Sequence, residues 1–319
     1  MNNPAKTSSA TIWPGLIAVY ISWGGTYLAI RFVIETLPPF LSGGFRFVIA
    51  GAVLYAFQRL RGAQPPQRTE WRSAAIVGLF MLVGGTGVVM WAEQRVASSI
   101  AALIIASVPL WMALIDSLRP GGRRPTGWVI SGVIAGFAGI LILVNPAQLL
   151  STAVTIDLVG ILALLFAAFS WASGSLYNRG AKLPASPLLG VGMEMLVGGF
   201  GLLFLGTVLG EWARFDLSAV TLRSWLGFAY LVVVGSWVGY ATYMWLLRVA
   251  PTMLVSTYAY VNPLVAILIG WLFAGEEMTP RIILAAVFIL GSVVSITLKQ
   301  PNRKKHVRGQ KISPTGSDD

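Results

Sequence analysis

Long runs of apolar residues, separated by short polar connections, make up most of the chain. Each run has about 20 residues, the length of helix that crosses a hydrocarbon core of about 30 Å. The runs are continuous and rich in Leu, Ala and Gly, whereas barrel strands alternate apolar and polar positions. The pattern predicts an all-α integral membrane protein with ten transmembrane helices, at residues 12–34, 40–61, 73–92, 97–117, 126–144, 157–178, 188–209, 225–247, 252–273 and 281–298.

The distribution of basic residues predicts how these helices are oriented. Lys and Arg collect in the cytoplasmic loops of membrane proteins, and acidic residues contribute little to this rule. With both ends of the chain in the cytoplasm, 17 of the 23 Lys and Arg lie in cytoplasmic segments and five in outer loops, with Arg46 inside a span. We therefore predict an N-in and C-in topology. The polar segment 299–319 is predicted to be a basic cytoplasmic tail without ordered structure.

The sequence of the first half of the chain recurs in the second half. The Ser-Trp pair that ends at Trp23 returns at Trp171, an offset of 148, and the offset of matching motifs rises to 154 further along. This pattern predicts two five-helix repeats, 12–144 and 157–298. Because five is odd, the two copies insert in opposite orientations. Inverted repeats are typical of secondary transporters, whose substrate site lies near the membrane midplane between the repeats.

Composition narrows the class further. The chain is 56% hydrophobic and only 11% charged, against roughly 25% charged residues in a soluble domain. The net charge of +11 lies in short loops and the tail, which argues against a nucleic-acid partner. There is no Cys, and the single His, His306, lies in the tail. We therefore predict no Cys-based metal site, no intramembrane histidine relay and no cofactor.

Several motifs in both halves resemble one family of permeases. They are Trp23 followed by Gly-Gly-Thr-Tyr, Ser107-Val-Pro-Leu-Trp111, Ser170-Trp171 and Tyr258-Ala-Tyr-Val-Asn-Pro263. With them, the chain resembles the EamA-domain branch of the drug/metabolite transporter superfamily over residues 12–298, and within it the YedA-like bacterial permeases. The resemblance implies a multi-pass protein of the bacterial inner membrane. It also implies a central cavity between helices one to four and six to nine, with the fifth and tenth helices outside it.

Arg46 and Glu194 are the ionisable residues that we expect well inside the spans, at matching positions of the two repeats. A charge at the centre of a transmembrane helix costs about 2.5–3.5 kcal/mol on insertion scales. Small residues one turn before and one turn after each of them on the same face indicate a cavity or a closely packed helix. One hypothesis is that Arg46 binds a carboxylate and that Glu194 binds a cationic group or carries a proton. The alternative is that local partners neutralise each charge and that both residues only fix helix packing.

Aromatic and hydroxyl-bearing residues at helical spacing are predicted to line the cavity, with ordinary packing as the alternative. The full set of predicted substrate-binding residues is Trp23, Tyr27, Arg46, Ser107, Trp111, Trp171, Ser175, Glu194, Tyr240, Tyr243, Tyr258 and Asn262.

Prolines and glycines suggest two further features. Pro109 and Pro263 occupy equivalent helices, where each removes a backbone N–H, so we predict hinges there, with simple kinks as the alternative. Gly132, Gly136 and Gly139 form a stripe of small residues on the fifth helix. The stripe is suited to a homodimer interface or to packing within the bundle, and packing is the preferred interpretation.

The predicted function is that of a secondary transporter and not of an enzyme. No catalytic or metal-binding motif is present, and no G-x-x-x-x-G-K-[ST] nucleotide-binding loop. A membrane-embedded enzyme, a receptor and a channel are the alternatives. We predict efflux of small metabolites, such as amino acids or amphipathic and cationic drugs, by alternating access. Proton coupling through Glu194 is predicted, with uncoupled facilitation or exchange left open. The expected partners are the small-molecule substrate and membrane lipid.

Overall fold

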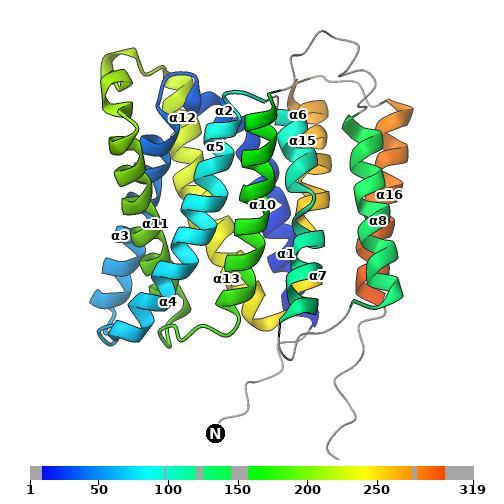
Figure 1. Cartoon of the computed structure of the whole chain (residues 1–319), viewed down its shortest axis with the longest axis horizontal. Helices are drawn as coiled ribbons and strands as arrows, with labels where there is room; N and C mark the ends of the chain where they lie inside the picture. The colour runs from blue at the N-terminus through cyan, green and yellow to red at the C-terminus, as the bar shows by residue number, and fades with distance from the viewer. Residues whose placement is uncertain (1–8, 97, 120–124, 145–156, 275–278, 299–319) are drawn as a thin grey trace, which may run out of the picture.

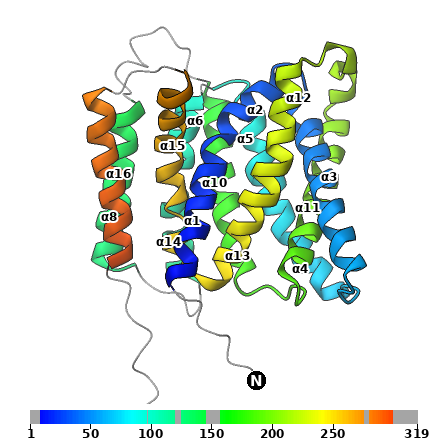
Figure 2. The same cartoon turned by 180° about the vertical axis from the view of Figure 1, so that it is seen from behind.

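A computed structural model describes residues 9–96, 98–119, 125–144, 157–274 and 279–298. Within these ranges the chain forms helices and the turns between them, and no strand occurs. The predicted tail, 299–319, lies outside the described residues. Long helices stand side by side in one bundle, and α1 begins at the same end of the bundle at which α16 ends (Figures 1 and 2).

The first half of the described chain supplies nine helical elements. They are α1 (Ser9–Gly24), α2 (Thr26–Ile34), α3 (Pro39–Leu60), α4 (Arg68–Gly78), η1 (Leu79–Gly87), α5 (Val88–Ala92), α6 (Ser98–Ile105), α7 (Val108–Leu118) and α8 (Gly127–Val144).

The second half supplies the remaining helical elements. They are α10 (Leu158–Asn178), α11 (Pro187–Val208), the 3₁₀ turns η2 (Glu211–Arg214) and η3 (Leu217–Ala219), α12 (Leu222–Tyr230), η4 (Leu231–Tyr240), α13 (Ala241–Val249), α14 (Thr252–Val255), α15 (Tyr258–Ala274) and α16 (Pro280–Leu298).

Helical stretches long and apolar enough to cross a membrane account for much of the bundle. Within the described ranges there are six: Thr11–Ile34, Pro39–Leu60, Arg68–Ala92, Leu158–Asn178, Pro187–Val208 and Leu222–Val249. Shorter apolar helices cover Val108–Leu118, Gly127–Ile142 and Pro280–Ile296. The helical, membrane-spanning class is therefore confirmed, while the count of ten spans and the inverted repeat stay predictions.

Two of the long spans contain wide turns in their middle. η1 joins α4 to α5, and η4 joins α12 to α13, as π-helix, in which backbone hydrogen bonds link residues five apart. Such segments are rare and often occur at functional sites. η1 begins at Leu79 and η4 at Leu231, which is 152 residues later. That spacing falls within the offsets of the sequence repeat.

Of the two predicted hinge prolines, Pro109 lies next to a break in the helix and Pro263 does not. Pro109 is the second residue of α7 and follows a break at residues 106–107. A proline in the first turn of a helix costs little, because the missing N–H has no helical partner there. Pro263 lies inside α15, which continues through it, and the break in that stretch lies earlier, at residues 256–257. A helix therefore begins beside Pro109, whereas no helix ends at Pro263.

α3 and α11 pack together with their backbones in close contact. A Cβ on Gly51 would lie 2.8 Å from the Gly192 carbonyl oxygen, and a Cβ on Gly199 would lie 2.7 Å from the Val48 nitrogen. Val48 comes before Gly51 in α3, but its partner Gly199 comes after Gly192 in α11. The two helices are therefore antiparallel. Small residues permit this approach, as in other membrane helix pairs.

Gly51→Ala is expected to destabilise the protein, because the new methyl group would meet α11 backbone that cannot move aside on its own. Overpacking costs about 1–3 kcal/mol, which exceeds the gain of up to about 1 kcal/mol from better helix propensity. Gly291→Ala is the matched control, since no atom lies within 4 Å of a Cβ at that position of α16. Thermal unfolding in detergent measures both variants. Equal unfolding temperatures would contradict the close contact.

α8 and α16 form a pair at one edge of the bundle (Figures 1 and 2). The predicted small-residue stripe of α8 faces this partner: a Cβ on Gly136 would lie 2.8 Å from Ser292 Oγ, and a Cβ on Gly139 would lie 2.7 Å from Ile289. The stripe is thus used for packing within the chain, which was the preferred interpretation. A homodimer, which stays a prediction, would need a different surface.

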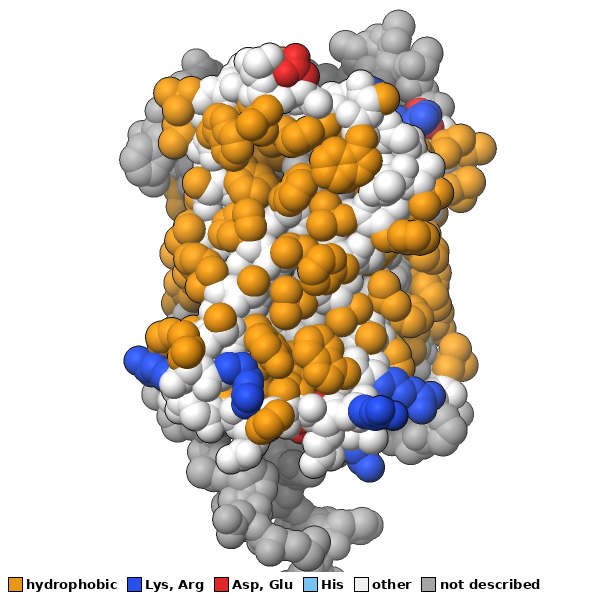
Figure 3. Space-filling view, turned by 90° about the vertical axis from the view of Figure 1, so that its left-hand side faces the viewer, with side chains coloured by type: hydrophobic (Ala, Val, Ile, Leu, Met, Phe, Trp, Pro, Cys, Tyr) orange, Lys and Arg blue, Asp and Glu red, His pale blue; other side chains and the backbone are white. Residues whose placement is uncertain are grey.

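The outward face of α3 and α11 is strongly apolar. Ile49, Val53 and Phe57 on α3 and Phe200 and Phe204 on α11 are exposed. Figure 3 shows that apolar side chains cover the middle of this face and that Lys and Arg gather at its lower edge. Such a band suits lipid tails, and basic residues at one edge suit the cytoplasmic boundary of a bilayer.

Glu211 fixes the start of α3 from the other half of the chain. Its carboxylate accepts hydrogen bonds from the backbone N–H groups of Phe40, at 3.3 Å, and Leu41, at 2.9 Å. The side chain is buried. The first N–H groups of a helix have no helical partner, so Glu211 stabilises this terminus through hydrogen bonds and through the helix dipole.

Candidate functional site

A cavity of about 100 Å³ lies between the two halves of the chain. It has room for a few water molecules and is smaller than the roughly 300 Å³ of typical small-molecule sites. Residues of α2 and α5 on its wall place it toward the end of the bundle at which α2 stands (Figure 1). Its wall consists of Trp23, Thr26, Tyr27, Ile30, Arg46, Phe47, Gly85, Thr86, Val89, Ile105, Val108, Ala167, Trp171, Gly235, Tyr240, Tyr258 and Asn262.

Arg46 brings a positive charge to this largely apolar wall. Its Nε donates a hydrogen bond to Ser236 Oγ at 2.9 Å, and that hydroxyl donates to the Leu231 carbonyl oxygen at 3.0 Å. Both partners belong to η4, so the π segment sets the orientation of the guanidinium. Arg46 is 4% exposed, and no Asp or Glu in the described ranges forms an ion pair with it. A buried guanidinium without an acidic partner can bind a carboxylate of a ligand.

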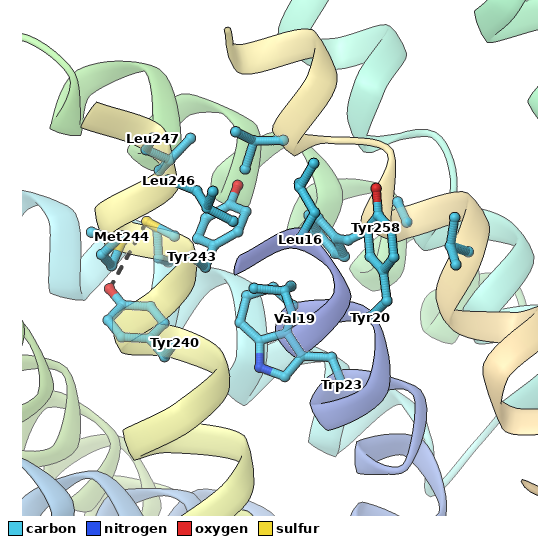
Figure 4. Close-up of a cluster of buried hydrophobic side chains, with 14 of the residues drawn as sticks. Leu16, Val19, Tyr20, Trp23, Tyr240, Tyr243, Met244, Leu246, Leu247 and Tyr258 are labelled. Atoms are coloured by element: carbon cyan, nitrogen blue, oxygen red, sulfur yellow. Dashed lines mark hydrogen bonds between the residues drawn. The ribbon is translucent and has the colours of Figure 1, made fainter. Parts of the chain in front are cut away.

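Aromatic rings from both halves meet at one end of the cavity, with Trp23 in the centre. The centroid of the Trp23 ring lies 5.0 Å from those of Tyr243 and Tyr258. It lies 5.5 Å from that of Trp171, which is 6.3 Å from Tyr240. Most of these pairs meet edge to face, an arrangement that stabilises aromatic clusters. Figure 4 shows Trp23 of α1 facing the tyrosines of η4 and α13.

Hydrogen bonds hold the two tryptophans of this cluster in place. Trp23 Nε1 donates to the Gly235 carbonyl oxygen of η4 at 3.1 Å. Trp171 Nε1 donates to the Tyr243 hydroxyl at 3.2 Å, and the same hydroxyl bonds with Ser175 Oγ at 2.9 Å. Ser175 and Tyr243 therefore lie behind the wall and orient Trp171, which lies on it.

Glu194 lies beside the cavity and not on its wall. Its side chain is fully buried, and the Tyr240 hydroxyl donates a hydrogen bond to its Oε2 at 3.2 Å. Glu194 Oε1 has no hydrogen-bond partner in the described part of the chain. Arg248 approaches from the end of α13, since its Nη2 would be 3.5 Å from a Cβ on Gly190, one turn before Glu194. Tyr240 thus links the carboxylate to the cavity through one hydrogen bond.

The structure brings seven of the 12 predicted substrate-binding residues to the wall: Trp23, Tyr27, Arg46, Trp171, Tyr240, Tyr258 and Asn262. Ser175, Tyr243 and Glu194 lie behind the wall, as described above. Ser107 donates to the Ile104 carbonyl oxygen at 2.6 Å, within its own helical stretch. Trp111 packs on Phe169 with a centroid distance of 5.4 Å. Neither Ser107 nor Trp111 is among the wall residues.

Other wall residues had not been predicted, chiefly Gly85 and Thr86 of η1 and Gly235 of η4. Their glycines let rings approach the backbone: a Cβ on Gly85 would lie 2.9 Å from the Trp171 ring. The clustering of glycines in these spans was a signal in the sequence, but small residues in membrane helices more often mark plain packing.

Comparison of the sequence with known proteins identifies its family. Residues 12–145 and 158–298 match the EamA-like transporter family. The chain belongs to this family. It is similar to the inner membrane transporter YedA of Escherichia coli, with 37% identity over 90% of each chain. It is also similar to the transporter YoaV of Bacillus subtilis, with 24% identity over 91% of this chain and 98% of that protein.

A solved crystal structure of another protein shares the fold of this EamA-like chain. The TM-score is 0.74 at 21% identity, over 92% of this chain and 99% of the other. Family membership and the apolar spans together establish a multi-pass transport protein of the inner membrane. Within the described ranges, α8 and α16 contribute none of the wall residues.

Proposed function

We propose that this EamA-like protein is a secondary transporter that exports small carboxylate-bearing metabolites with an apolar or aromatic body, such as amino acids. The observation that carries the proposal is Arg46, a guanidinium without an acidic partner in the described residues, in a cavity whose remaining wall is mostly aromatic and apolar. The charge suits a carboxylate, and the rings suit an apolar or cationic remainder.

The proposal includes alternating access by two inverted repeats. α3 and α11 are equivalent helices that cross antiparallel, and Gly44 and Gly51 on one correspond to Gly192 and Gly199 on the other at the offset of 148. The π segments η1 and η4 also stand at equivalent positions. These pairs support a two-fold relation between the halves, in which each repeat moves against the other around a shared site.

The present cavity must widen before it can hold an amino acid, because its volume of about 100 Å³ is below that of typical ligand sites. The helix break before Pro109 and the break at 256–257 lie in equivalent stretches and supply the places at which α6–α7 and α14–α15 can bend. With the ends of the chain in the cytoplasm, as the basic residues predict, the cavity faces outward and the aromatic cluster closes it toward the cytoplasm.

A flux assay with the purified full chain in proteoliposomes tests this proposal. We expect counterflow of a labelled aromatic amino acid, little counterflow of its carboxyl amide, and faster net export when the side that corresponds to the cell exterior is acidic. Equal transport of the acid and the amide would contradict carboxylate recognition. Absence of flux for amino acids and cationic drugs alike would contradict the transporter proposal itself, and flux without any response to pH would identify an uncoupled exchanger or facilitator.

A further inference from the structure

Glu93 is a further buried carboxylate, separate from Glu194 and Glu211. It directly follows the last residue of the Arg68–Ala92 span, at the end of the bundle where α2 stands. The side chain is only 9% exposed. Neither carboxylate oxygen has a hydrogen-bond partner among the described residues. A buried carboxylate that lacks partners is costly when it is ionised, so this position favours the neutral acid.

The surroundings place Glu93 at the rim of the cavity. Val89 lines the cavity and lies one helical turn before Glu93, on the same face of α5. Tyr27 also lines the cavity and lies within electrostatic range of Glu93. Arg31 follows Tyr27 by one turn on α2 and acts on Glu93 electrostatically. It does not come within ion-pair distance in the described structure.

The other charged groups near this rim are already engaged. Arg95 forms an ion pair with Asp157, the N-cap of α10, at 3.2 Å and stacks on Trp91. Arg46 on α3 is hydrogen bonded to Ser236. η1, which also packs against α5, carries no ionisable residue. The groups that face Glu93 from the elements packed around it are therefore Tyr27 and Arg31 of α2, Arg46 of α3 and the Arg95–Asp157 pair.

We propose that Glu93 is a proton-binding site at the outer rim of the cavity, which takes up a proton from the exterior solution in each transport cycle. The inference rests on the proposed proton-coupled export. It adds an acid on the exterior side of Arg46, whereas Glu194 lies behind Tyr240 on the other side of the cavity. Uptake converts the carboxylate to the neutral acid, and release to water restores the carboxylate.

Electrostatics agree with this assignment. Burial raises the pKa of the Glu93 carboxyl to about 8, and Arg31 acts in the opposite direction. The acid is thus protonated below about pH 8 and ionises as the pH rises through that value, close to the pH at which a transporter works. The ionised form would be attracted to Arg31, so the proton also controls how α5 and α2 interact at the rim.

Glu93→Gln tests the proposal, with Glu35→Gln as the matched control. Glu35 caps α2 at the same end of the bundle, but its side chain is 41% exposed and lies 3.9 Å from Arg223. All infrared measurements use a Glu194→Gln background, so that the second buried proton-binding carboxyl contributes no band. In difference spectra of the purified full chain, taken across a pH titration, we expect a carbonyl band of a neutral carboxylic acid that titrates near pH 8. The band should persist in the control and be absent from Glu93→Gln. A band that is unchanged in Glu93→Gln would overturn the proposal.

Transport supplies the second measurement. The ratio of flux with an acidic exterior to flux at equal pH should fall by roughly tenfold or more in Glu93→Gln and be unchanged in Glu35→Gln. Glu93→Asp, which keeps an acid, should retain part of the response and a titrating band. A full pH response in Glu93→Gln would overturn the role in transport. If the wild type itself shows no pH response, the proposed coupling fails, and the infrared band still decides whether Glu93 binds the proton.

Discussion

Glu194→Gln is expected to abolish the component of transport that depends on a pH gradient, while the protein stays folded. Gln has the shape of the neutral acid, so the buried site keeps its packing, but it can neither bind nor release a proton. The Tyr240 hydroxyl can still donate to the Gln carbonyl oxygen as it does to Glu194 Oε2. Loss of general acid or base function typically costs about 10²–10⁴-fold in rate, so the gradient-driven flux should fall into the background.

The reason for choosing Glu194 is its position and not only its charge. Its carboxylate is fully buried within a described span and is hydrogen bonded to Tyr240, whose side chain lines the cavity. Tyr240→Phe removes that hydrogen bond without changing the ring. It should weaken the pH response less than Glu194→Gln does, because the carboxyl group itself remains.

Glu211→Gln is the control for the loss of a buried carboxylate in general. Glu211 is also buried, but it caps α3 and lies outside the cavity wall. This variant should lower the unfolding temperature, because Gln accepts through one oxygen only and leaves one of the two helix N–H groups without its acceptor, which costs about 1–3 kcal/mol. Its ratio of gradient-driven to equal-pH flux should match that of the wild type. A Glu194→Gln protein with an unchanged ratio would exclude this residue as the proton carrier.

Sequence patterns predicted the wall residues that are conspicuous in an apolar helix. Trp23, Trp171 and Arg46 are large or charged residues at inward-facing positions, and burying them elsewhere would cost free energy. The same reasoning placed Ser175 and Tyr243 on the wall, yet both are one layer behind it. Helical periodicity indicates which face of a helix points inward, but not which neighbouring ring covers that face.

The parts of the site that escaped prediction depend on neighbours far away in the chain. Gly85 and Gly235 lie on the wall within π turns, and such turns depart from the α-helical spacing on which the sequence prediction rested. Glu93 falls where a span gives way to a loop, a position at which an acid usually faces water. Its burial depends on the elements packed against α5, chiefly α10, η1 and α3, which no local signal in the sequence reveals.

Arg46 variants are expected to remove the preference for a carboxylate. In the wild type, the amino acid should bind more tightly than its carboxyl amide, because hydrogen bonds to charged groups contribute about 1.5–3 kcal/mol, roughly tenfold to a hundredfold in affinity. Arg46→Gln removes the charge and should bring the two affinities close together. Arg46→Lys keeps the charge but loses the planar fork, so it should retain only part of the preference.

The variant Ser236→Ala tests whether the orientation of the Arg46 guanidinium matters in addition to its charge. Ser236 Oγ accepts from Arg46 Nε at 2.9 Å and is itself tied to Leu231. Without the hydroxyl the guanidinium remains in the cavity but is free to turn, so the preference for the acid should fall between those of the wild type and Arg46→Gln. Competition binding of acid and amide to the purified chain measures all four proteins. An Arg46→Gln protein that still prefers the acid would mean that another group binds the carboxylate. A Ser236→Ala protein with the acid preference of the wild type would mean that packing on the Phe47 ring, 4.6 Å from the guanidinium, is enough to orient Arg46.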